Sequence, residues 1–259
     1  MWDPAAYHRF GNERSRPFAD LMARVGAEHP RAVADLGCGT GELTETLAER
    51  WPRARVAGLD SSAEMIATAG ARGGRAEFRL GDLAQWRPDP DTDVVVTNAA
   101  LQWVPGHGEM LSRWIRTLPP GAWLALQVPG NFDAHSHRLL REVARSRPYA
   151  AVLGDLVREA PVDDAAGYAN RLLAEGARVD AWETTYVHLL SAAGDDHPVL
   201  RWMEGTALRP VKAALDGTAW RAFRATLGAK LAAVYPTRSG MVAFPFRRIF
   251  VVAHVQEEK

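Results

Sequence analysis

The sequence contains little cysteine and lacks a long apolar run. Among its 259 residues there is one cysteine, so the chain cannot form an internal disulfide. Cys38 lies between two glycines, a position that favours a small buried side chain over a nucleophile. No apolar run is long enough to span a membrane, and the start lacks the basic and apolar regions of a secretory signal. We therefore expect a cytoplasmic protein without a membrane partner.

The chain also has no excess of positive or negative charge and no histidine spacing typical of a metal site. Lys plus Arg equals Asp plus Glu, at 31 each, which disfavours a nucleic-acid partner. The closest histidine pair, His135 and His137, is poorly spaced for holding a metal on a helix. We therefore expect no metal site.

The basic residues are distributed unevenly along the chain. Between residues 200 and 254 the acidic residues are Glu204 and Asp216, whereas the basic residues are Arg201, Arg209, Lys212, Arg221, Arg224, Lys230, Arg238, Arg247 and Arg248. Many of these should lie on solvated helix faces, because Lys and Arg are seldom fully buried. The excess nevertheless favours a small anionic partner in this part of the chain.

The first half alternates short β-rich runs with helical stretches, a pattern typical of an α/β fold with a doubly wound parallel sheet. We expect strands at 31–36, 55–59, 75–80, 93–98 and 122–128. We expect helices at 41–50, from Ser61 or Ser62 to 71, and at 108–118. Later helices are expected at 137–147, 165–176 and through 198–235, with strands near 179–189 and 246–255. We interpret the later helices as a cap over the open edge of the sheet.

The stretch "DLGCGTG", residues 35–41, places glycines at 37, 39 and 41 after an apolar run. Such a turn between a strand and a helix brings backbone N–H groups close to a ligand. A dinucleotide fingerprint would require a third glycine at 42, where Glu42 stands and would repel a pyrophosphate. Asp35 suits a cofactor that carries an amino group and a ribose instead. S-adenosylmethionine fits this description, with Gly37, Gly39 and Gly41 approaching it.

Aspartates fall near the ends of the first three expected strands. Ligands of open α/β sheets bind at the carboxyl ends of the strands. Asp60 can accept hydrogen bonds from two ribose hydroxyls, and Asp82 can accept one from an adenine amino group. Met65 and Leu83 would supply apolar contact to the ring. Asp60 or Asp82 alone could equally be a helix cap or turn residue.

The residues from 33 to 129 resemble the class I S-adenosylmethionine-dependent methyltransferases. The stretches that carry this resemblance, in the family's order, are "VADLGCGTG", "GLDSS", "GDLAQW", "DVVVTNAALQWV" and "LPPGAWLALQVP". The resemblance implies a Rossmann-like, mostly parallel seven-stranded sheet with an antiparallel last strand, plus a helical cap. It implies a helical arm at 1–30 and a methyltransferase domain at 31–259, with cap insertions at about 130–175 and 197–237. Ser61 and Asn98 would join the cofactor-binding residues.

Within this family the chain also resembles the trans-aconitate 2-methyltransferases over nearly its full length. The stretches that carry this likeness include "WDPAAYHRFGNERSRPF", "PGNF", "DAWETTYVH" and "FPFRRIFVVA". The pattern differs mainly at 147–163 and 212–230. The resemblance implies methyl esterification of one carboxylate of a small tricarboxylate. A carboxylate has a pKa of about 4.3, so it is already nucleophilic at neutral pH and needs no general base.

A tricarboxylate acceptor needs cationic partners for the carboxylates that do not react. Arginine pairs with carboxylates through two parallel hydrogen bonds. We expect Arg209 and Arg248 to fill this role, with His137 and Tyr186 as further donors. Arg14 and Arg16 are candidates for either the acceptor or the methionyl carboxylate. The remaining candidates border the transferred methyl group and are Asn98, Gln102 and Trp103.

Three alternatives arise from the sequence, and two of them stay open. The acceptor could be another acid, or a phenol, whose pKa of about 10 would require a base such as His107, His135 or His137. The protein could bind the cofactor without catalysis, as a regulator. A nicotinamide oxidoreductase is disfavoured by Glu42.

Overall fold

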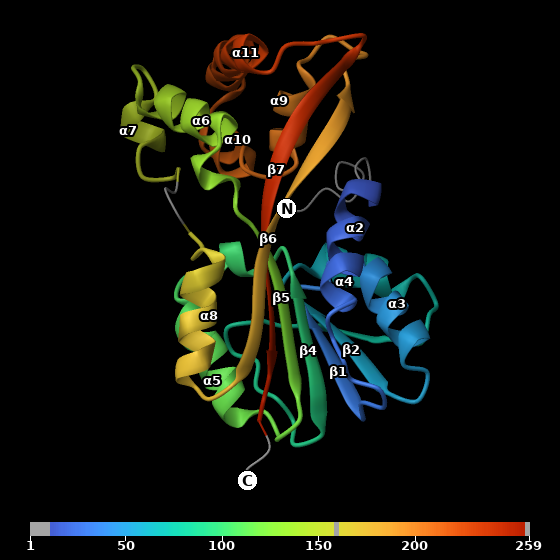
Figure 1. The fold of residues 1–259 in the computed structure, drawn as a ribbon. Coiled ribbons are helices and arrows are strands. Elements are labelled where there is room, and N and C mark those ends of the chain that lie inside the picture. The colour runs from blue at the N-terminus through green and yellow to red at the C-terminus, as the bar shows by residue number, and fades with distance from the viewer. Residues whose placement is uncertain (1–10, 158–160, 257–259) are drawn as a thin grey trace. The chain divides into compact units, whose positions relative to one another are not determined.

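The structure, a computed structural model, describes residues 11–157 and 161–256. It contains a seven-stranded sheet in the order β3-β2-β1-β4-β5-β7-β6 (Figure 1). The parallel strands are β1 (Ala32–Leu36), β2 (Arg55–Asp60), β3 (Glu77–Leu80), β4 (Thr92–Asn98) and β5 (Trp123–Pro129). β7 (Met241–His254) runs antiparallel to β5, and β6 (Arg178–Ser191) lies next to β7. The α/β class and the mostly parallel sheet with an antiparallel last strand are confirmed.

The chain divides into two compact units. Unit 1 contains the described residues up to Pro129, then Val162–Thr184, then those from Arg248 onward. Unit 2 contains the described parts of Gly130–Pro161 and Thr185–Arg247. The expected division into an arm, a methyltransferase domain and a cap stays a prediction, and the helix within 165–176 belongs to unit 1.

Helices cover both faces of the sheet in unit 1 (Figure 1). One face carries α2 (Gly11–Met22), α3 (Glu42–Arg50) and α4 (Ala63–Gly70), and the other carries α5 (His107–Thr117) and α8 (Ala165–Ala174). Ser62 begins α4, because its hydroxyl accepts a hydrogen bond from the backbone N–H of Met65 at 3.3 Å. Of the two serines that the sequence offered, Ser62 is therefore the cap.

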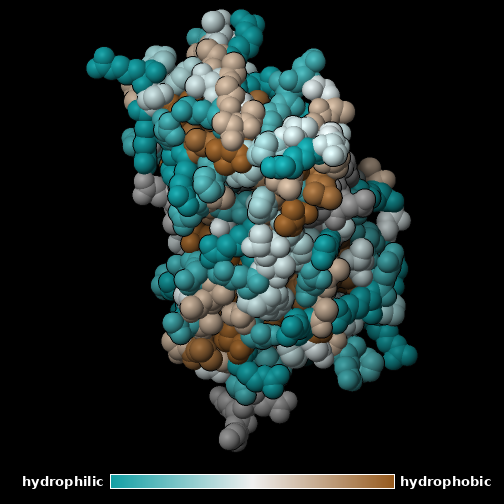
Figure 2. All heavy atoms as spheres, turned by 45° about the horizontal axis from the view of Figure 1, so that its top comes forward, coloured by the Kyte–Doolittle hydropathy of each residue, from teal (hydrophilic) through white to brown (hydrophobic). Residues whose placement is uncertain are grey.

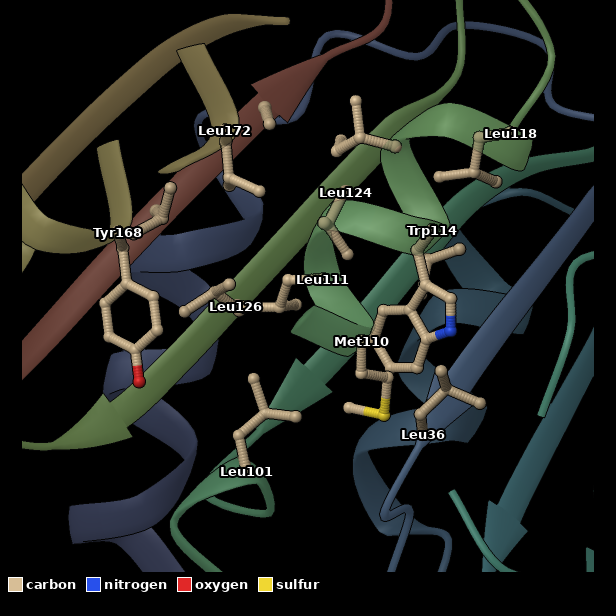
Figure 3. Close-up of a cluster of buried hydrophobic side chains, with 14 of the residues drawn as sticks. Leu36, Leu101, Met110, Leu111, Trp114, Leu118, Leu124, Leu126, Tyr168 and Leu172 are labelled. Carbon is tan, nitrogen blue, oxygen red and sulfur yellow. The ribbon is translucent and has the colours of Figure 1, made fainter. Parts of the chain in front are cut away.

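The main core of unit 1 lies between the sheet and the pair α5 and α8 (Figure 3). Trp114 and Leu111 of α5 face Leu124 and Leu126 of β5, and all four side chains are fully buried. Burying one such aliphatic side chain stabilises the fold by about 1.5–3 kcal/mol. The central strand β4 is apolar on both faces, as expected for a strand covered by helices on both sides.

Unit 2 contains η2 (Asn131–Asp133), α6 (His135–Arg145), α7 (Ala150–Leu153), α9 (Pro198–Glu204), α10 (Arg209–Ala214) and α11 (Gly217–Val234). The expected helical stretch at 198–235 is thus three helices. α9 ends at Glu204 with Gly205 as its C-cap. Asp216 begins α11 by accepting hydrogen bonds from two backbone N–H groups at 2.8 Å. The helix α7 was not expected from the sequence.

The last strand begins at Met241, five residues before the expected start at 246. Pro245 lies inside the strand, and proline is usually read as a strand boundary because it cannot donate a ladder hydrogen bond. Its side chain is exposed. Strand β7 therefore continues through a residue that predicts a break.

The surface carries mixed polar and apolar side chains. Figure 2 shows hydrophilic residues over most of the visible face, with smaller hydrophobic areas between them. Among residues 11–157 and 161–256, no helix has the length and apolar character needed to cross a membrane.

Candidate functional site

The glycine-rich turn connects β1 to α3 in unit 1. All three glycines have left-handed backbone conformations, with φ of 83° at Gly37, 55° at Gly39 and 75° at Gly41. The N–H of Gly37 donates to the carbonyl of Leu59 on β2 at 2.7 Å. This geometry disfavours any residue with a side chain, so the expected bare turn is present.

The three glycines differ in what surrounds them. A methyl group added at Gly37 would lie 2.3 Å from Cβ of Ala100, and one at Gly41 would lie 2.5 Å from the ring of Phe78. At Gly39 such a methyl group would meet no described atom within 4 Å. Gly37 and Gly41 therefore permit packing inside the protein, whereas the space beside Gly39 is open.

This difference predicts different effects of alanine at the two positions. Gly39→Ala should cost only the left-handed backbone strain, roughly 1–2 kcal/mol of stability, yet lower cofactor affinity about tenfold by filling the open space. Gly37→Ala should cost roughly 1–3 kcal/mol more, because its methyl group overlaps Ala100. Thermal unfolding and calorimetric titration with S-adenosylmethionine measure both effects. Unchanged affinity in Gly39→Ala would remove Gly39 from the binding surface.

Asp35 is a buried carboxylate at the end of β1, with 3% of its surface exposed. One oxygen accepts a hydrogen bond from the hydroxyl of Thr44 at 2.6 Å. Burial raises the pKa of Asp35 from 3.8 to about 6, and the negative charge of Asp60 adds to this shift. A carboxylate that is destabilised by burial gains from a cationic partner, as a methionyl amino group would be.

Asp60 ends β2 and holds two backbone segments. One carboxylate oxygen accepts from the N–H of Gly39 at 2.9 Å, and the other accepts from the N–H of Ser62 at 2.9 Å. Each oxygen has a second lone pair, so two ribose hydroxyls remain possible donors. Asp60 thereby fixes the glycine turn against the start of α4.

The adenine candidates lie after β3 and on α4. Asp82 is exposed, and one oxygen accepts from the N–H of Ala84 at 2.8 Å, which makes Asp82 a turn residue as well as a candidate acceptor. Leu83 and Met65 are buried, with 8% and 2% of their surfaces exposed. Ser61 is exposed. Their contact with a ring stays a prediction.

Cys38 lies within the same turn and is partly buried. Its thiol is close to two acidic groups, Asp35 and Asp60. Burial, together with these negative charges, raises the pKa of the thiol far above its usual range. The thiol is therefore protonated at neutral pH, which agrees with the expectation that Cys38 is no nucleophile.

The end of β4 combines backbone strain with polar side chains. Ala99 adopts a left-handed conformation, with φ of 55°. Its carbonyl accepts a hydrogen bond of 2.6 Å from the amide of Gln102, which is 8% exposed. The buried side-chain oxygen of Asn98 has no partner among the described residues. Strain and unsatisfied polar atoms gather at functional sites.

Trp103 follows Gln102 in η1 (Leu101–Trp103) and is 38% exposed. Its place beside the transferred methyl group stays a prediction.

Arg248 lies at the start of the unit 1 part of β7 and is 4% exposed. Its guanidinium donates to the side-chain oxygen of Gln127 at 3.1 Å. Gln127 was missed in the sequence analysis, although a glutamine within the apolar stretch "LALQVP" was a visible signal.

The other acceptor candidates belong to unit 2. Tyr186 on β6 is 5% exposed, and Arg209 begins α10 and is half-buried. His137 lies on α6, with its Nδ1 3.3 Å from the hydroxyl of Ser136. Loss of hydration, with a further effect of Arg141, lowers the pKa of His137 to about 4. At neutral pH His137 is therefore a neutral hydrogen-bonding group and not a cation.

Several basic residues of the C-terminal third make contacts within unit 2. Arg224 pairs with Glu204 and Asp196, and Lys230 pairs with Glu142 at 2.8 Å. The guanidinium of Arg201 donates to two backbone carbonyls. These three basic residues have partners within the protein. Part of the positive charge in this region is therefore used for structure and not for an anionic ligand.

Arg14 and Arg16 lie on α2, and the side chain of Arg14 is outside the described part of the chain. His107 is held between the carbonyl of Val104 at 3.0 Å and the hydroxyl of Tyr168 at 2.6 Å. Within the described residues no group of His, Cys, Asp and Glu side chains could hold a metal ion.

The cofactor candidates of unit 1 fit S-adenosylmethionine chemically. Gly39 leaves an open space beside the turn, and Asp35 offers a buried negative charge for an amino group. Asp60 has free lone pairs for hydroxyl donors. The oxygen of Asn98 is a buried acceptor without a partner in the described ranges. These are the kinds of group that a nucleoside with an amino-acid tail requires.

Comparison with known proteins agrees with this chemistry. Residues 33–121 match a methyltransferase domain family. The chain is 53% identical over 260 residues to a trans-aconitate 2-methyltransferase of Mycobacterium sp. (strain KMS), covering 98% of this chain and 99% of that protein. It is 53% identical over 259 residues to the trans-aconitate 2-methyltransferase of Rhodococcus jostii (strain RHA1), covering 99% and 100%. The crystal structure of the YcgJ protein from Bacillus subtilis shares the fold, with a TM-score of 0.61 at 13% identity over 94% of this chain and 100% of that one.

Proposed function

Because this chain belongs to the trans-aconitate 2-methyltransferase family, we propose that it methylates one carboxylate of trans-aconitate with S-adenosylmethionine as methyl donor. The observation that carries the proposal is 53% identity over 98% of the chain. The protein is thus a carboxyl O-methyltransferase and produces a methyl ester. Its partner is a small tricarboxylate, and we place the reaction in the cytoplasm.

The cofactor-binding residues proposed here all lie in unit 1. Asp35 would pair with the methionyl amino group, Asp60 with the ribose hydroxyls, and Asp82 with the adenine amino group. When bound, S-adenosylmethionine would supply an electrophilic methyl group on its sulfonium sulfur; a C–O bond to the acceptor would form as the C–S bond breaks, and the sulfur would leave as a neutral thioether. The glycine turn and Asp60 are joined by a hydrogen bond within the protein itself, from the N–H of Gly39 at 2.9 Å. This pre-organisation lowers the entropy cost of binding.

The acceptor residues have a positioning task and no proton to remove. An acceptor carboxylate is ionised at neutral pH and already carries its nucleophilic lone pair. What the protein must supply is alignment of one oxygen with the methyl group and pairing for the other two carboxylates. Arg248 of unit 1 would provide positive charge for one carboxylate. In unit 2, Arg209 stays a candidate cation, and His137, neutral with a pKa of about 4, stays a candidate hydrogen-bonding group. His107 is already bonded to Val104 and Tyr168, which does not favour a phenol acceptor that needs this base.

The direct test of the function is a product assay. Purified protein is incubated with methyl-labelled S-adenosylmethionine and, separately, with trans-aconitate, cis-aconitate, isocitrate, citrate and a simple phenol. We expect a methyl ester to form fastest from trans-aconitate, as detected by mass spectrometry. Cofactor binding without an ester from any acid would overturn the proposed function and leave a non-catalytic binding protein.

The buried carboxylate predicts a pH dependence of cofactor binding. Asp35 has a pKa of about 6 in the protein without ligand, and below that pH it is protonated and no longer attracts an amino group. Calorimetry should show affinity falling by up to tenfold for each unit below pH 6. Asp35→Asn should bind weakly with no such dependence. A flat profile for the unaltered protein between pH 5 and 7 would contradict the role of Asp35.

The same pKa shift also makes the stability of the fold depend on pH, in the opposite direction to cofactor binding. The folded carboxyl of Asp35 holds its proton more tightly than the unfolded chain does, with pKa values of about 6 against 3.8. The cofactor-free protein therefore loses stability from this group as the pH rises between these two values. Asp35→Asn should remove this loss and raise the midpoint of thermal unfolding at pH 7.

A further inference from the structure

Polar side chains form a row across five neighbouring strands of unit 1. In the register of the sheet, Asp35 pairs with Val96 and with Gly58, Asn98 pairs with Gln127, and Pro129 pairs with Arg248. Paired residues share a face of a sheet, as do residues two apart on one strand. The polar row on one face therefore consists of Asp60, Asp35, Asn98, Gln127 and Arg248.

The charges of this polar row change sign from one end to the other. The carboxylates of Asp60 and Asp35 lie on β2 and β1, and the guanidinium of Arg248 lies on β7, four strands away from β2 in the strand order. Asn98 and Gln127, both neutral amides, lie between them. Such a row suits a cationic and hydroxyl-bearing ligand at one end and an anionic ligand at the other.

Gln127 connects the neutral middle of the row to its cationic end. Its side chain has no exposed surface, and its oxygen Oε1 accepts from Nη1 of Arg248 at 3.1 Å. A guanidinium only donates, so the amide oxygen must face Arg248 and the amide nitrogen Nε2 must be the other end. Among the described residues this buried Nε2 has no hydrogen-bond partner.

A buried donor without an acceptor is costly, and a ligand that accepts from it removes this cost. Resting on the proposed function, we propose that Gln127 is a binding residue for the acceptor. Its Nε2 donates to a carboxylate oxygen of the tricarboxylate, while its Oε1 holds the guanidinium of Arg248 in place beside that carboxylate. The acceptor thus lies over β4, β5 and β7, and the cofactor over β2, β1 and β4.

Two substitutions separate this role from a structural one. Gln127→Glu replaces the donor Nε2 by an oxygen but keeps an oxygen for Arg248, and the charged pair should hold at least as well. The added negative charge should repel the acceptor and raise its KM about 30-fold, with the cofactor Kd within about threefold. Gln127→Leu, which removes both hydrogen bonds, should raise the KM about tenfold.

Thr97→Val is the matched control. Thr97 is fully buried on β4, its hydroxyl has no partner in the described part of the chain, and it pairs with Leu126 on the opposite face of the sheet. The change removes a buried polar atom without changing the shape, so thermal stability should rise and the KM should not change.

Each outcome has a defined meaning. A raised KM in Gln127→Glu together with an unchanged or higher unfolding midpoint supports the proposal. If Gln127 only held Arg248 in place, a variant that keeps the contact with Arg248 would also keep the KM. Turnover of trans-aconitate by the unaltered protein, with the same KM in both Gln127 variants, overturns this inference alone. Absence of turnover by the unaltered protein overturns the proposed function and the role of Gln127 with it.

Discussion

Asp60→Ala should lower the affinity for S-adenosylmethionine at least about 100-fold. Two hydrogen bonds from ribose hydroxyls to a carboxylate contribute ~1.5–3 kcal/mol each, and every ~1.4 kcal/mol changes the Kd tenfold. The loss has a second source, because the carboxylate also accepts from the backbone N–H groups of Gly39 and Ser62. The glycine turn would therefore lose its connection to α4. Calorimetric titration measures the affinity.

Asp60→Asn is the companion variant that separates the two sources. Its amide keeps one oxygen for a backbone N–H group but places an NH2 group where the other oxygen accepts. We expect an intermediate affinity and a folded protein by circular dichroism. Asp82→Ala, on an exposed turn residue, should weaken binding less. Affinity in Asp60→Ala equal to that of the unaltered protein would refute the ribose assignment.

Arg248→Met should raise the KM for trans-aconitate about 100-fold or more and leave the cofactor Kd nearly unchanged. Arg248 is 4% exposed, so its charge acts in a poorly hydrated environment where one guanidinium can form two charge-assisted hydrogen bonds to a carboxylate. Each such bond contributes ~1.5–3 kcal/mol. Methionine has a similar length and no charge, so the change removes the attraction while filling most of the space. Steady-state kinetics with both substrates varied give the two constants.

Arg116→Met controls for the loss of one positive charge. Arg116 pairs with Glu175 on the surface of unit 1, and its side chain is 54% exposed. Its kinetics should match those of the unaltered protein, since exposed ion pairs contribute little. Arg209→Met tests the second nominated arginine by the same assay. If neither Arg248→Met nor Arg209→Met changes the KM, positive charge from these residues is not used for the acceptor.

The glycine turn was predictable because its determinants are local. The residues from Asp35 to Gly41 follow one another in the sequence, and positive φ values leave glycine as the favoured residue. Asp60 and Asp82 were placed from strand ends, and parallel strands bring their carboxyl ends to one edge of the sheet. The parallel direction of the first five strands was expected from the alternation of strands and helices.

The contact between Gln127 and Arg248 was not predictable in the same way. The two residues are separated by 121 positions and meet only because β7 pairs antiparallel with β5. Sequence patterns indicate that each strand exists but not which residues face each other across it. The same limit applies to the cations of unit 2, where the partners of Arg224 lie 20 and 28 positions away.

The single thiol of the chain lies in the glycine turn, where its reaction with an alkylating reagent can be followed. Cys38 is partly buried and its pKa is raised by burial, so almost none of it is thiolate at neutral pH. Alkylating reagents attack the thiolate, whose fraction rises when a cysteine reaches water and its pKa returns to about 8.5. Labelling of Cys38 by iodoacetamide should therefore be slow at neutral pH, and a ligand bound at the turn should slow it further.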